Sequence, residues 1–170
     1  MARDRDFLNL YCYTGAFSCY AALGGARTTM SVDRSETAIG WARENMNLNG
    51  ILEAGNELVQ ADTFDFLAQA KKQGRIFDLA MVDPPSYSTT RSRNAAFDIL
   101  KDHPRLLSGV MELMAPGGVI FFSTNHQNFV LDEAALSETT IHEITGQTIP
   151  EDYVSKRKTI HRCWKIIVPG

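Results

Sequence analysis

The sequence contains no long hydrophobic run and little cysteine. No apolar stretch approaches the ~18 residues that a helix needs to cross a bilayer, and residues 1–6 are too charged for a secretory signal. The three cysteines, Cys12, Cys19 and Cys163, form no CxxC motif and cannot all be paired in disulfides. This cysteine usage suits a reducing compartment. We therefore predict a cytoplasmic protein whose thiols are buried or idle.

The sequence also lacks grouped metal ligands and an excess of positive charge. Its four histidines are too scattered to predict a metal site, and the formal net charge of −3 argues against strong nonspecific binding of nucleic acid. Two short basic stretches are candidates for contacts with nucleic-acid phosphates, and a solvated charged face is the ordinary alternative. They contain Arg91 and Arg93 in the first stretch and Lys156, Arg157 and Lys158 in the second.

Strands and helices are predicted to alternate along most of the 170 residues, from the hydrophobic pattern and the turn residues. The expected strands span 7–12, 28–32, 57–61, 79–82, 119–123, 142–145 and 160–168. The expected helices span 16–23, 35–48, 64–72, 95–114 and 130–136, and Pro104 is expected at a break or in a first turn.

This alternation predicts a Rossmann-like α/β fold, formed by a single domain over residues 1–170. We expect a mostly parallel seven-stranded sheet with helices on both faces. The last two strands have no predicted helix between them, so they should form an antiparallel hairpin at one edge, with Cys163 in an edge strand. Ligands of such sheets bind at the C-terminal ends of the strands, near the point where the strand order reverses.

Acidic residues follow three of the predicted parallel strands, and a short loop, Tyr13-Thr14-Gly15, follows the first. The carboxylates are Asp33, Asp62 and Asp83. Asp33 follows Gly15 by eighteen residues, close to the ~20 expected of a carboxylate that binds ribose hydroxyls. Capping of the next helix is the alternative role for Asp33. The spacing favours a bound nucleoside.

The loop after the first strand contains neither GxGxxG nor GxxxxGK[ST], so it is a poor site for a pyrophosphate or a triphosphate. This disfavours NAD, FAD and ATP. S-adenosylmethionine has a nucleoside without phosphates, and its cationic sulfonium and amino groups tolerate neighbouring carboxylates that would repel a phosphate. Asp62 is placed to accept from the adenine amino group, with Thr63 and Phe64 as backbone donors and an apolar wall. Helix capping by Asp62 is equally compatible, and the two roles can coexist.

The strand that ends at Asp83 leads into a stiff turn, because Pro84 and Pro85 have no N–H group and restrict the residue before each of them. Tyr87 then offers a flat ring on which an unpaired or flipped base could stack. A plain strand end with a surface tyrosine is the alternative. Taken with the other strand ends, the turn is expected to lie beside the methyl donor.

Several blocks of the sequence, in order along nearly its whole length, resemble the bacterial 23S ribosomal RNA methyltransferases with a Rossmann-like catalytic domain. The resemblance is strongest to the guanine-N7 methyltransferase domain of the bifunctional large-subunit enzymes. The blocks are FLNLYCYTGAF at 7–17, LGGAR at 23–27, VDRS at 32–35, WARENMNLNG at 41–50, QAD at 60–62, FDLAMVDPPSYS at 77–88, AFDILKDH at 96–103, FFSTN at 121–125, EITGQTIPEDY at 143–153 and IHRCW at 160–164.

The resemblance implies S-adenosylmethionine as cofactor, 23S rRNA as partner and a class I methyltransferase fold. In such enzymes the positions that match Tyr13, Gly15, Asp33, Asp62 and Asp83 contact the cofactor, and the DPPS turn faces the target base. We assign the cofactor site to Tyr13, Thr14, Gly15, Ala16, Asp33, Arg34, Asp62, Thr63, Phe64 and Asp83. The catalytic and base-positioning set is Asp83, Pro84, Pro85, Tyr87 and Asn125, with no metal. Family members carry an upstream extension, so we expect a fragment of a longer protein.

Guanine N7 already presents a lone pair, so transfer needs positioning more than a base, and Asp83 is expected to orient donor and guanine. A related branch that makes 5-methylcytosine needs a cysteine nucleophile beside the fifth strand, where this sequence reads Ser123-Thr124-Asn125 without a thiol. A non-catalytic nucleotide-binding or RNA-binding domain is the third possibility. The sequence predicts no oligomeric state.

Overall fold

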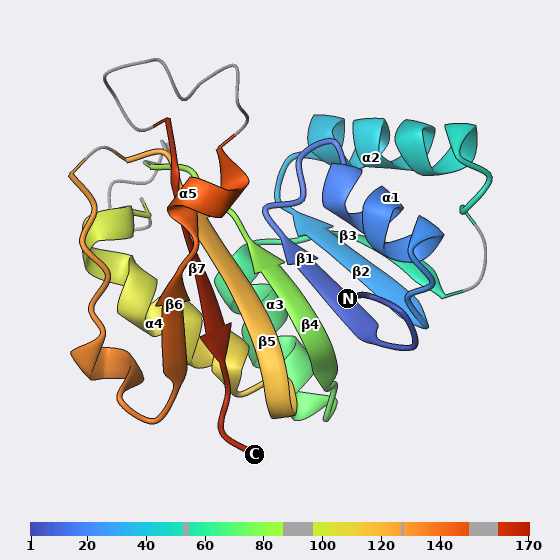
Figure 1. Cartoon of the computed structure of the whole chain (residues 1–170). Helices are drawn as coiled ribbons and strands as arrows, with labels where there is room; N and C mark the ends of the chain where they lie inside the picture. The colour runs from blue at the N-terminus through green and yellow to red at the C-terminus, as the bar shows by residue number, and fades with distance from the viewer. Residues whose placement is uncertain (53–54, 87–96, 127, 150–159) are drawn as a thin grey trace.

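Seven strands form one sheet in the order β3-β2-β1-β4-β5-β7-β6 (Figure 1). The computed structural model describes residues 1–52, 55–86, 97–126, 128–149 and 160–170. The strands are β1 (Asp6–Leu10), β2 (Thr28–Asp33), β3 (Asn56–Gln60), β4 (Phe77–Val82), β5 (Met114–Thr124), β6 (Thr140–Glu143) and β7 (Arg162–Ile167). The predicted α/β fold with a seven-stranded sheet is confirmed.

The strand order reverses at β1, which pairs in parallel with both β2 and β4. β2 pairs in parallel with β3, and β4 with β5. The C-terminal ends of these five strands therefore lie along one edge of the sheet, and the reversal between β1 and β4 opens a crevice there. β7 runs antiparallel to both of its neighbours, β5 and β6.

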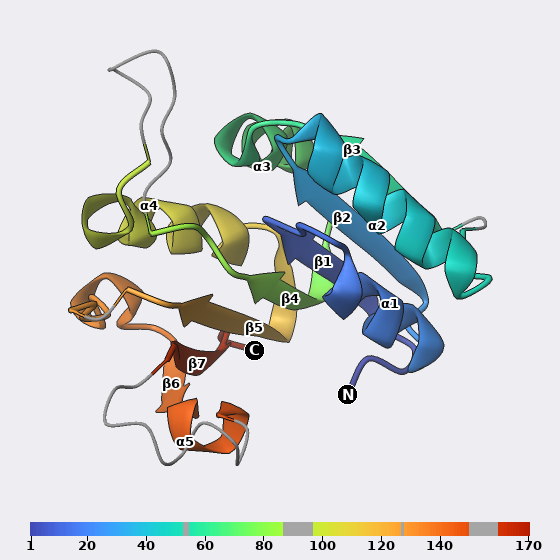
Figure 2. The ribbon, with the colours of Figure 1, turned by 90° about the horizontal axis from the view of Figure 1, so that it is seen from above.

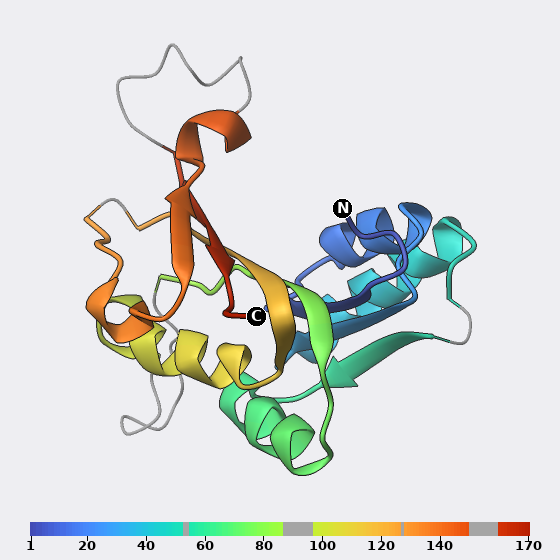
Figure 3. The same cartoon turned by 60° about the horizontal axis from the view of Figure 1, so that its bottom comes forward.

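Helices cover both faces of the sheet (Figure 2 and Figure 3). α1 (Ala16–Leu23) and α2 (Glu36–Leu48) pack on one face over β1, β2 and β3. α3 (Thr63–Lys72) and α4 (Ile99–Met111) lie on the opposite face, where they enclose the largest hydrophobic core. That core includes Leu8, Leu10, Leu107, Ile120 and Phe122, all completely buried. No helix in the described ranges is long and apolar enough to cross a membrane.

Side-chain caps explain where three helices begin. Ser35 precedes α2 and accepts from the N–H of Ala38 at 3.2 Å. Asp62 caps α3, and Asp98 caps α4 by accepting from the N–H of Leu100 at 3.0 Å. A short polar side chain before a helix satisfies N–H groups that have no partner within it. These caps place residues 33–35 and 62–65 at fixed positions beside the sheet edge.

The C-terminal third differs from the prediction in several details. The helix expected at 130–136 is only a 3₁₀ turn, η1 (Ala134–Leu136), and β6 covers 140–143 instead of 142–145. A four-residue helix, α5 (Thr145–Thr148), separates β6 from β7, so the expectation of no helix there was wrong. Cys163 was also wrongly placed in an edge strand, because β6 forms the edge and β7 lies inside the sheet.

Pro104 lies inside α4, neither at a break nor in the first turn. A proline at this position removes one N–H donor, which would otherwise pair with the carbonyl of Leu100. Leu100 is an exposed residue, so water can solvate that carbonyl. The strongly amphipathic pattern of α4 and its buried face, which includes Leu106, Leu107 and Val110, hold the helix together across the proline.

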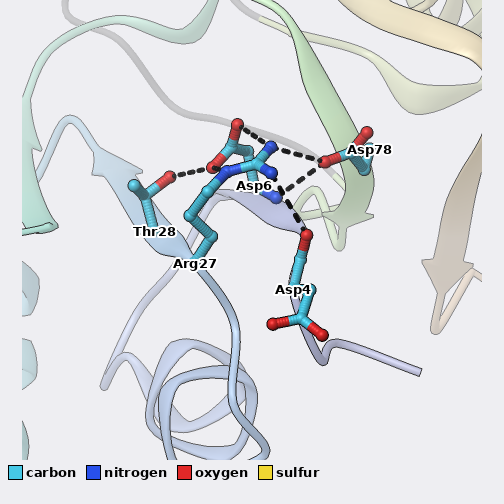
Figure 4. Close-up of polar contacts among 5 residues, drawn as sticks. All are labelled: Asp4, Asp6, Arg27, Thr28 and Asp78. Carbon is cyan, nitrogen blue, oxygen red and sulfur yellow. Dashed lines mark hydrogen bonds and ion pairs between the residues drawn. The ribbon is translucent and has the colours of Figure 1, made fainter.

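An arginine-centred cluster ties together the N-terminal ends of β1, β2 and β4 (Figure 4). Arg27 donates to both carboxylate oxygens of Asp6, at 2.9 Å from Nε and 2.5 Å from Nη2, and Nη2 also lies 3.2 Å from Oδ2 of Asp78. The hydroxyl of Thr28 donates to Asp6 at 2.8 Å. The hydrogen bond from Arg27, aided by that from Thr28, holds the pKa of Asp6 below its usual value. At this end of the sheet, two carboxylates thus share one guanidinium within the protein.

Candidate functional site

A cavity of about 1380 Å³ opens at the C-terminal ends of the parallel strands. Pockets for small ligands usually measure about 300–1,000 Å³, so this cavity has room for a cofactor and for part of a second molecule. Its lining brings together most of the predicted site residues from five separate segments. These are Tyr13, Asp33, Arg34, Asp62, Thr63, Phe64, Asp83, Pro84, Pro85 and Asn125.

The remaining predicted residues fall into two groups: three that lie outside the cavity lining, and others that lie outside the residues that the structure describes. Thr14, Gly15 and Ala16 lie at the start of α1, beside the cavity lining. Tyr87, the proposed stacking ring, lies outside the described residues, as do Arg91, Arg93, Lys156, Arg157 and Lys158.

Gly15 has a clear structural reason to be glycine. Its φ is 70°, a left-handed value that disfavours larger residues, and a Cβ atom there would lie only 2.8 Å from Cβ of Ala42. The N–H of Gly15 donates to the carbonyl of Cys12 at 2.8 Å, which closes the turn after β1. Gly15 therefore lets α1 begin in close contact with α2, and this contact sets the position of the loop that carries Tyr13.

Asp33 at the end of β2 is held by two backbone donors. The N–H of Tyr13 donates to Oδ2 at 3.1 Å, and the N–H of Ser35 donates to Oδ1 at 2.9 Å. Ser35 caps α2, so Asp33 is not the capping residue that was weighed as its alternative role. A carboxylate oxygen can accept more than one hydrogen bond. The carboxylate is therefore fixed in orientation while its outer lone pairs can still accept from ligand hydroxyls.

Asp62 has the capping role that was weighed for it. Its Oδ1 accepts from the N–H groups of Phe64 at 2.9 Å and Asp65 at 3.4 Å. Both hydrogen bonds that Asp62 accepts from described residues use Oδ1, which leaves Oδ2 for a ligand in the cavity. Capping and ligand binding are thus compatible in this geometry, as expected.

The ends of β4 and β5 are joined by two side-chain hydrogen bonds. The hydroxyl of Ser123 donates to Oδ1 of Asp83 at 2.5 Å, and the hydroxyl of Ser86 donates to Oδ1 of Asn125 at 2.6 Å. Pro84, which lies between Asp83 and Ser86 in the sequence, is buried, whereas Asp83 is exposed to the cavity. The diproline turn is therefore anchored on both sides, to Ser123 in β5 and to Asn125, which directly follows β5. The sequence analysis missed the role of Ser123 because the pairing of β4 with β5 is not visible in a linear pattern.

Cys163 also lines the cavity, directly opposite Ser123 in the β5–β7 pairing. A thiol therefore does lie beside the fifth strand, contributed by a different part of the chain. Burial, together with the nearby charge of Asp83, raises the pKa of the Cys163 thiol to about 11. The thiolate, which is the nucleophilic form, is disfavoured at neutral pH.

The donor set fits S-adenosylmethionine better than a phosphate-bearing cofactor. Five aspartates, including Asp33, Asp62 and Asp83, line the cavity together with two arginines, Arg34 and Arg105, so acidic groups outnumber basic ones there. Negative charge at this edge attracts a sulfonium or an amino group and repels phosphates. The sequence assigned Asp33 to the ribose hydroxyls and Asp62 to the adenine amino group, and these two assignments and a role for Asp83 beside the methyl donor stay predictions.

Comparison with known proteins agrees with this chemistry. The family model of the S-adenosylmethionine-dependent methyltransferases matches residues 1–157. The ribosomal RNA large subunit methyltransferase K of Neisseria meningitidis is 42% identical over 165 residues, covering 97% of this chain and 46% of that protein. The K/L enzyme of Methylococcus capsulatus is 43% identical over 169 residues, covering 99% of this chain and 23% of that protein. The chain thus spans half or less of the length of these relatives.

Solved structures give the same result. SMU.776, proposed to be a methyltransferase and solved in complex with SAH, superposes with a TM-score of 0.85 at 26% identity. The match covers 98% of this chain and 46% of that one. A protein from Streptococcus mutans, proposed to be an S-adenosylmethionine-dependent methyltransferase, gives a TM-score of 0.82 at 26% identity, with 98% and 45% covered. By the family match over 157 residues, the fold and the cavity chemistry, this chain belongs to the S-adenosylmethionine-dependent methyltransferase family.

Proposed function

We propose that the chain is the catalytic domain of a cytoplasmic methyltransferase that modifies 23S rRNA at guanine N7. The observation that carries this proposal is the meeting of Asp33, Asp62 and Asp83 in one cavity, next to the rigid turn at Pro84 and Pro85. The first three would hold the cofactor, and the turn would present the target base to it. The names of the relatives supply the substrate class, large-subunit rRNA.

S-adenosylmethionine, when bound, supplies a methyl group on a positively charged sulfur. The chain's own residues must hold that group in line with the acceptor and keep the base at reactive distance. Asp83 is the residue proposed to orient the methyl donor and the acceptor base, because Ser123 fixes its carboxylate at the start of the diproline turn. A ring nitrogen such as guanine N7 has a lone pair and no proton to lose. Asp83 therefore needs no function as a base.

The base-facing side of the cavity would be formed by Pro84, Pro85 and Asn125, with Tyr87 as the stacking ring. Asn125 is held by Ser86 at 2.6 Å, which fixes its amide for reading a base edge. Phosphate contacts are proposed for Arg91, Arg93, Lys156, Arg157 and Lys158. We place these contacts by sequence alone.

Cytosine-C5 methylation is the second candidate, and Cys163 is the observation that favours it. That reaction needs a thiolate that adds to the pyrimidine ring. Cys163 lies at the cavity, but the raised pKa of its thiol works against this role. Incubation with RNA containing 5-fluorocytosine distinguishes the two. We expect no covalent adduct and undiminished methyl transfer by Cys163→Ser, whereas an adduct lost in Cys163→Ser would establish the C5 reaction.

The proposed function is tested by mass mapping of ribosomal RNA from a strain that lacks the gene. We expect one guanine of 23S rRNA to lose a methyl group and to regain it on complementation with the wild-type gene. Complementation with the Asp83→Ala variant is the matched control and should not restore the methyl group. Unchanged 23S rRNA in the deletion strain would contradict the proposed substrate.

Cofactor binding is tested separately on the purified chain. Calorimetric titration should detect S-adenosylhomocysteine and should give no heat with NAD. Binding of NAD alone would remove the methyl-transfer proposal and favour a nucleotide-binding domain.

A further inference from the structure

Two strained tyrosines flank Cys12 where β1 ends at the cavity. Tyr11 has φ 58° and Tyr13 has φ 48°, and within the described ranges Asp4 is the remaining non-glycine residue with a positive φ. Left-handed backbone is strained for residues with a Cβ and is usually given to glycine. Such strain persists at functional sites, where the side chain is needed for a reason other than the turn.

Tyr13 already has an assignment, since its N–H holds Asp33, but Tyr11 has none. The Tyr11 side chain points to the opposite side of the sheet edge from Tyr13. Tyr13 packs edge-on against Trp41 of α2 at 5.5 Å, whereas Tyr11 packs on Phe97 at 6.0 Å, in front of α4. Tyr11 is half-buried and lines the cavity, as does Phe97. The strained turn after β1 therefore directs the Tyr13 ring towards α2 and the Tyr11 ring towards Phe97.

Tyr11 belongs to an aromatic wall that runs towards the predicted adenine side. Phe97 lies between Tyr11 and Phe64, whose ring is 6.4 Å away. The guanidinium of Arg105 lies 4.2 Å from the centroid of the Phe64 ring and covers one of its faces. Phe64 alone thus offers a ligand only part of its surface. Tyr11 and Phe97 supply the apolar area that Phe64 cannot.

The hydroxyl of Tyr11 is tied to the same side of the cavity. Burial raises the pKa of Tyr11 to about 12, and a side-chain hydrogen bond with Thr63 and the charge of Asp62 act on the same hydroxyl. The phenol is therefore neutral at physiological pH, and the ring remains an uncharged surface. Thr63 directly follows Asp62, the residue assigned to the adenine amino group. The Tyr11 side chain therefore lies near the proposed adenine position.

We propose that Tyr11 is a further cofactor-binding residue, whose ring forms with Phe64 and Phe97 the apolar wall of the adenosyl site. This inference rests on the proposed assignment of the strand-end carboxylates to S-adenosylmethionine. It also explains why a tyrosine occupies a position where the backbone favours glycine: the ring is needed in the site, and the strain is tolerated.

The test compares two glycine substitutions that relieve the same backbone strain in different places. Tyr11→Gly removes the ring from the cavity, and Asp4→Gly acts at the N-terminal end of the sheet, beside Arg27 (Figure 4). Tyr11→Phe keeps the ring and removes the hydroxyl. Calorimetric titrations with S-adenosylhomocysteine and with 5′-methylthioadenosine measure the whole cofactor product and its adenosyl part separately.

We expect Tyr11→Gly to weaken both ligands by the same factor, about tenfold, because one aromatic contact is lost from the adenosyl site. Tyr11→Phe and Asp4→Gly should stay within about twofold of wild type. If Tyr11→Gly does not fold, as judged by circular dichroism, Tyr11→Asn, which removes the apolar ring and tolerates a left-handed backbone, should show the same loss.

Unchanged affinity in Tyr11→Gly, or in its replacement Tyr11→Asn, while wild type binds would overturn this inference alone. A loss confined to S-adenosylhomocysteine would place the ring at the amino-acid end and also contradict it. Absence of binding by wild type would instead overturn the proposed function, and this inference with it.

Discussion

The two ends of the parallel strands carry carboxylates in opposite circumstances. At the N-terminal ends, Asp6 and Asp78 share the guanidinium of Arg27 (Figure 4). At the C-terminal ends, Asp33, Asp62 and Asp83 accept from N–H groups and a serine hydroxyl and face a cavity. In the first group two carboxylates share one guanidinium, so their charge is partly compensated within the protein. The second group is oriented by uncharged donors, in a cavity where aspartates outnumber the two arginines, Arg34 and Arg105.

This difference shows how one sheet separates structural from functional charge. A carboxylate paired with an arginine contributes to holding strands together and has little attraction left for a ligand. A carboxylate oriented by neutral dipoles keeps its full charge, which a cationic cofactor can use. Substitutions at the two ends should therefore have separable effects, on stability at one end and on ligand affinity at the other.

The largest effect is expected from Asp33→Ala. Removing a charge-assisted bond to the ribose should weaken S-adenosylhomocysteine by about 1.5–3 kcal/mol, measured by calorimetry. The unfolding midpoint should change little, because among the described residues Asp33 accepts from two loop N–H groups, those of Tyr13 and Ser35. Unchanged affinity would mean that Asp33 does not face the ligand and that the comparison of the two ends is mistaken.

A smaller effect is expected from Ser123→Ala. The serine hydroxyl orients Asp83 at 2.5 Å, and its loss should lower methyl transfer about fivefold at saturating cofactor. Ser123→Thr keeps a hydroxyl and is the matched variant, expected to recover most of the rate. Equal rates for the alanine variant and wild type would show that Asp83 needs no orientation by β5.

Arg27→Met should lower thermal stability and leave ligand affinity unchanged, which is the opposite of the result expected for Asp33→Ala. The side chain of Arg27 is 57% exposed, so screening by water makes its contribution to stability small. We expect the thermal unfolding midpoint to fall by about 2 °C. Calorimetry should find the affinity for S-adenosylhomocysteine unchanged. A loss of affinity comparable to that of Asp33→Ala would erase the distinction between the two ends.

The smallest expected effect is the pH dependence of the stability difference between wild type and Arg27→Met. The hydrogen bond from Arg27 depresses the pKa of Asp6 below its ordinary value of 3.8. The stability from this group is therefore present above that value and is lost as the pH falls through the folded-state pKa. Unfolding midpoints of wild type and Arg27→Met should differ at about pH 7 and converge as the pH falls below 3.8 and through the lower folded-state pKa of Asp6.

Comparing wild type with Arg27→Met also removes the contribution of other acidic groups to the pH dependence of stability, because both proteins contain them. Arg162 and Thr145 lower the pKa of Glu143 by hydrogen bonds, and this depression is common to wild type and Arg27→Met. A difference between the two midpoints that persists unchanged at low pH would show that Asp6 is not the partner through which Arg27 stabilises the fold.

The sequence predicted the parallel half of the molecule well because its signals are local. Apolar runs end at Asp33 and Asp83, and Ser35 and Asp62 are capping residues at the starts of helices. Each of these features depends on neighbours within a few positions. The cavity could be anticipated for the same reason, since parallel strands bring their C-terminal ends to one edge.

The C-terminal third and the cross-strand contacts could not be read in this way. The places of β7 inside the sheet and of Cys163 opposite Ser123 depend on strand pairing between residues about 40 positions apart in sequence. The Tyr11–Phe97 contact joins residues even farther apart. Residues 130–136 had an apolar pattern too short to distinguish a helix from the 3₁₀ turn that forms.

The most direct measurement of the central claim is a crystal structure with S-adenosylhomocysteine bound. The account predicts the ribose hydroxyls on Asp33, the adenine amino group on Asp62 and the sulfur facing Asp83 and the diproline turn. A ligand bound elsewhere, or one that reaches fewer than two of these carboxylates, would contradict it.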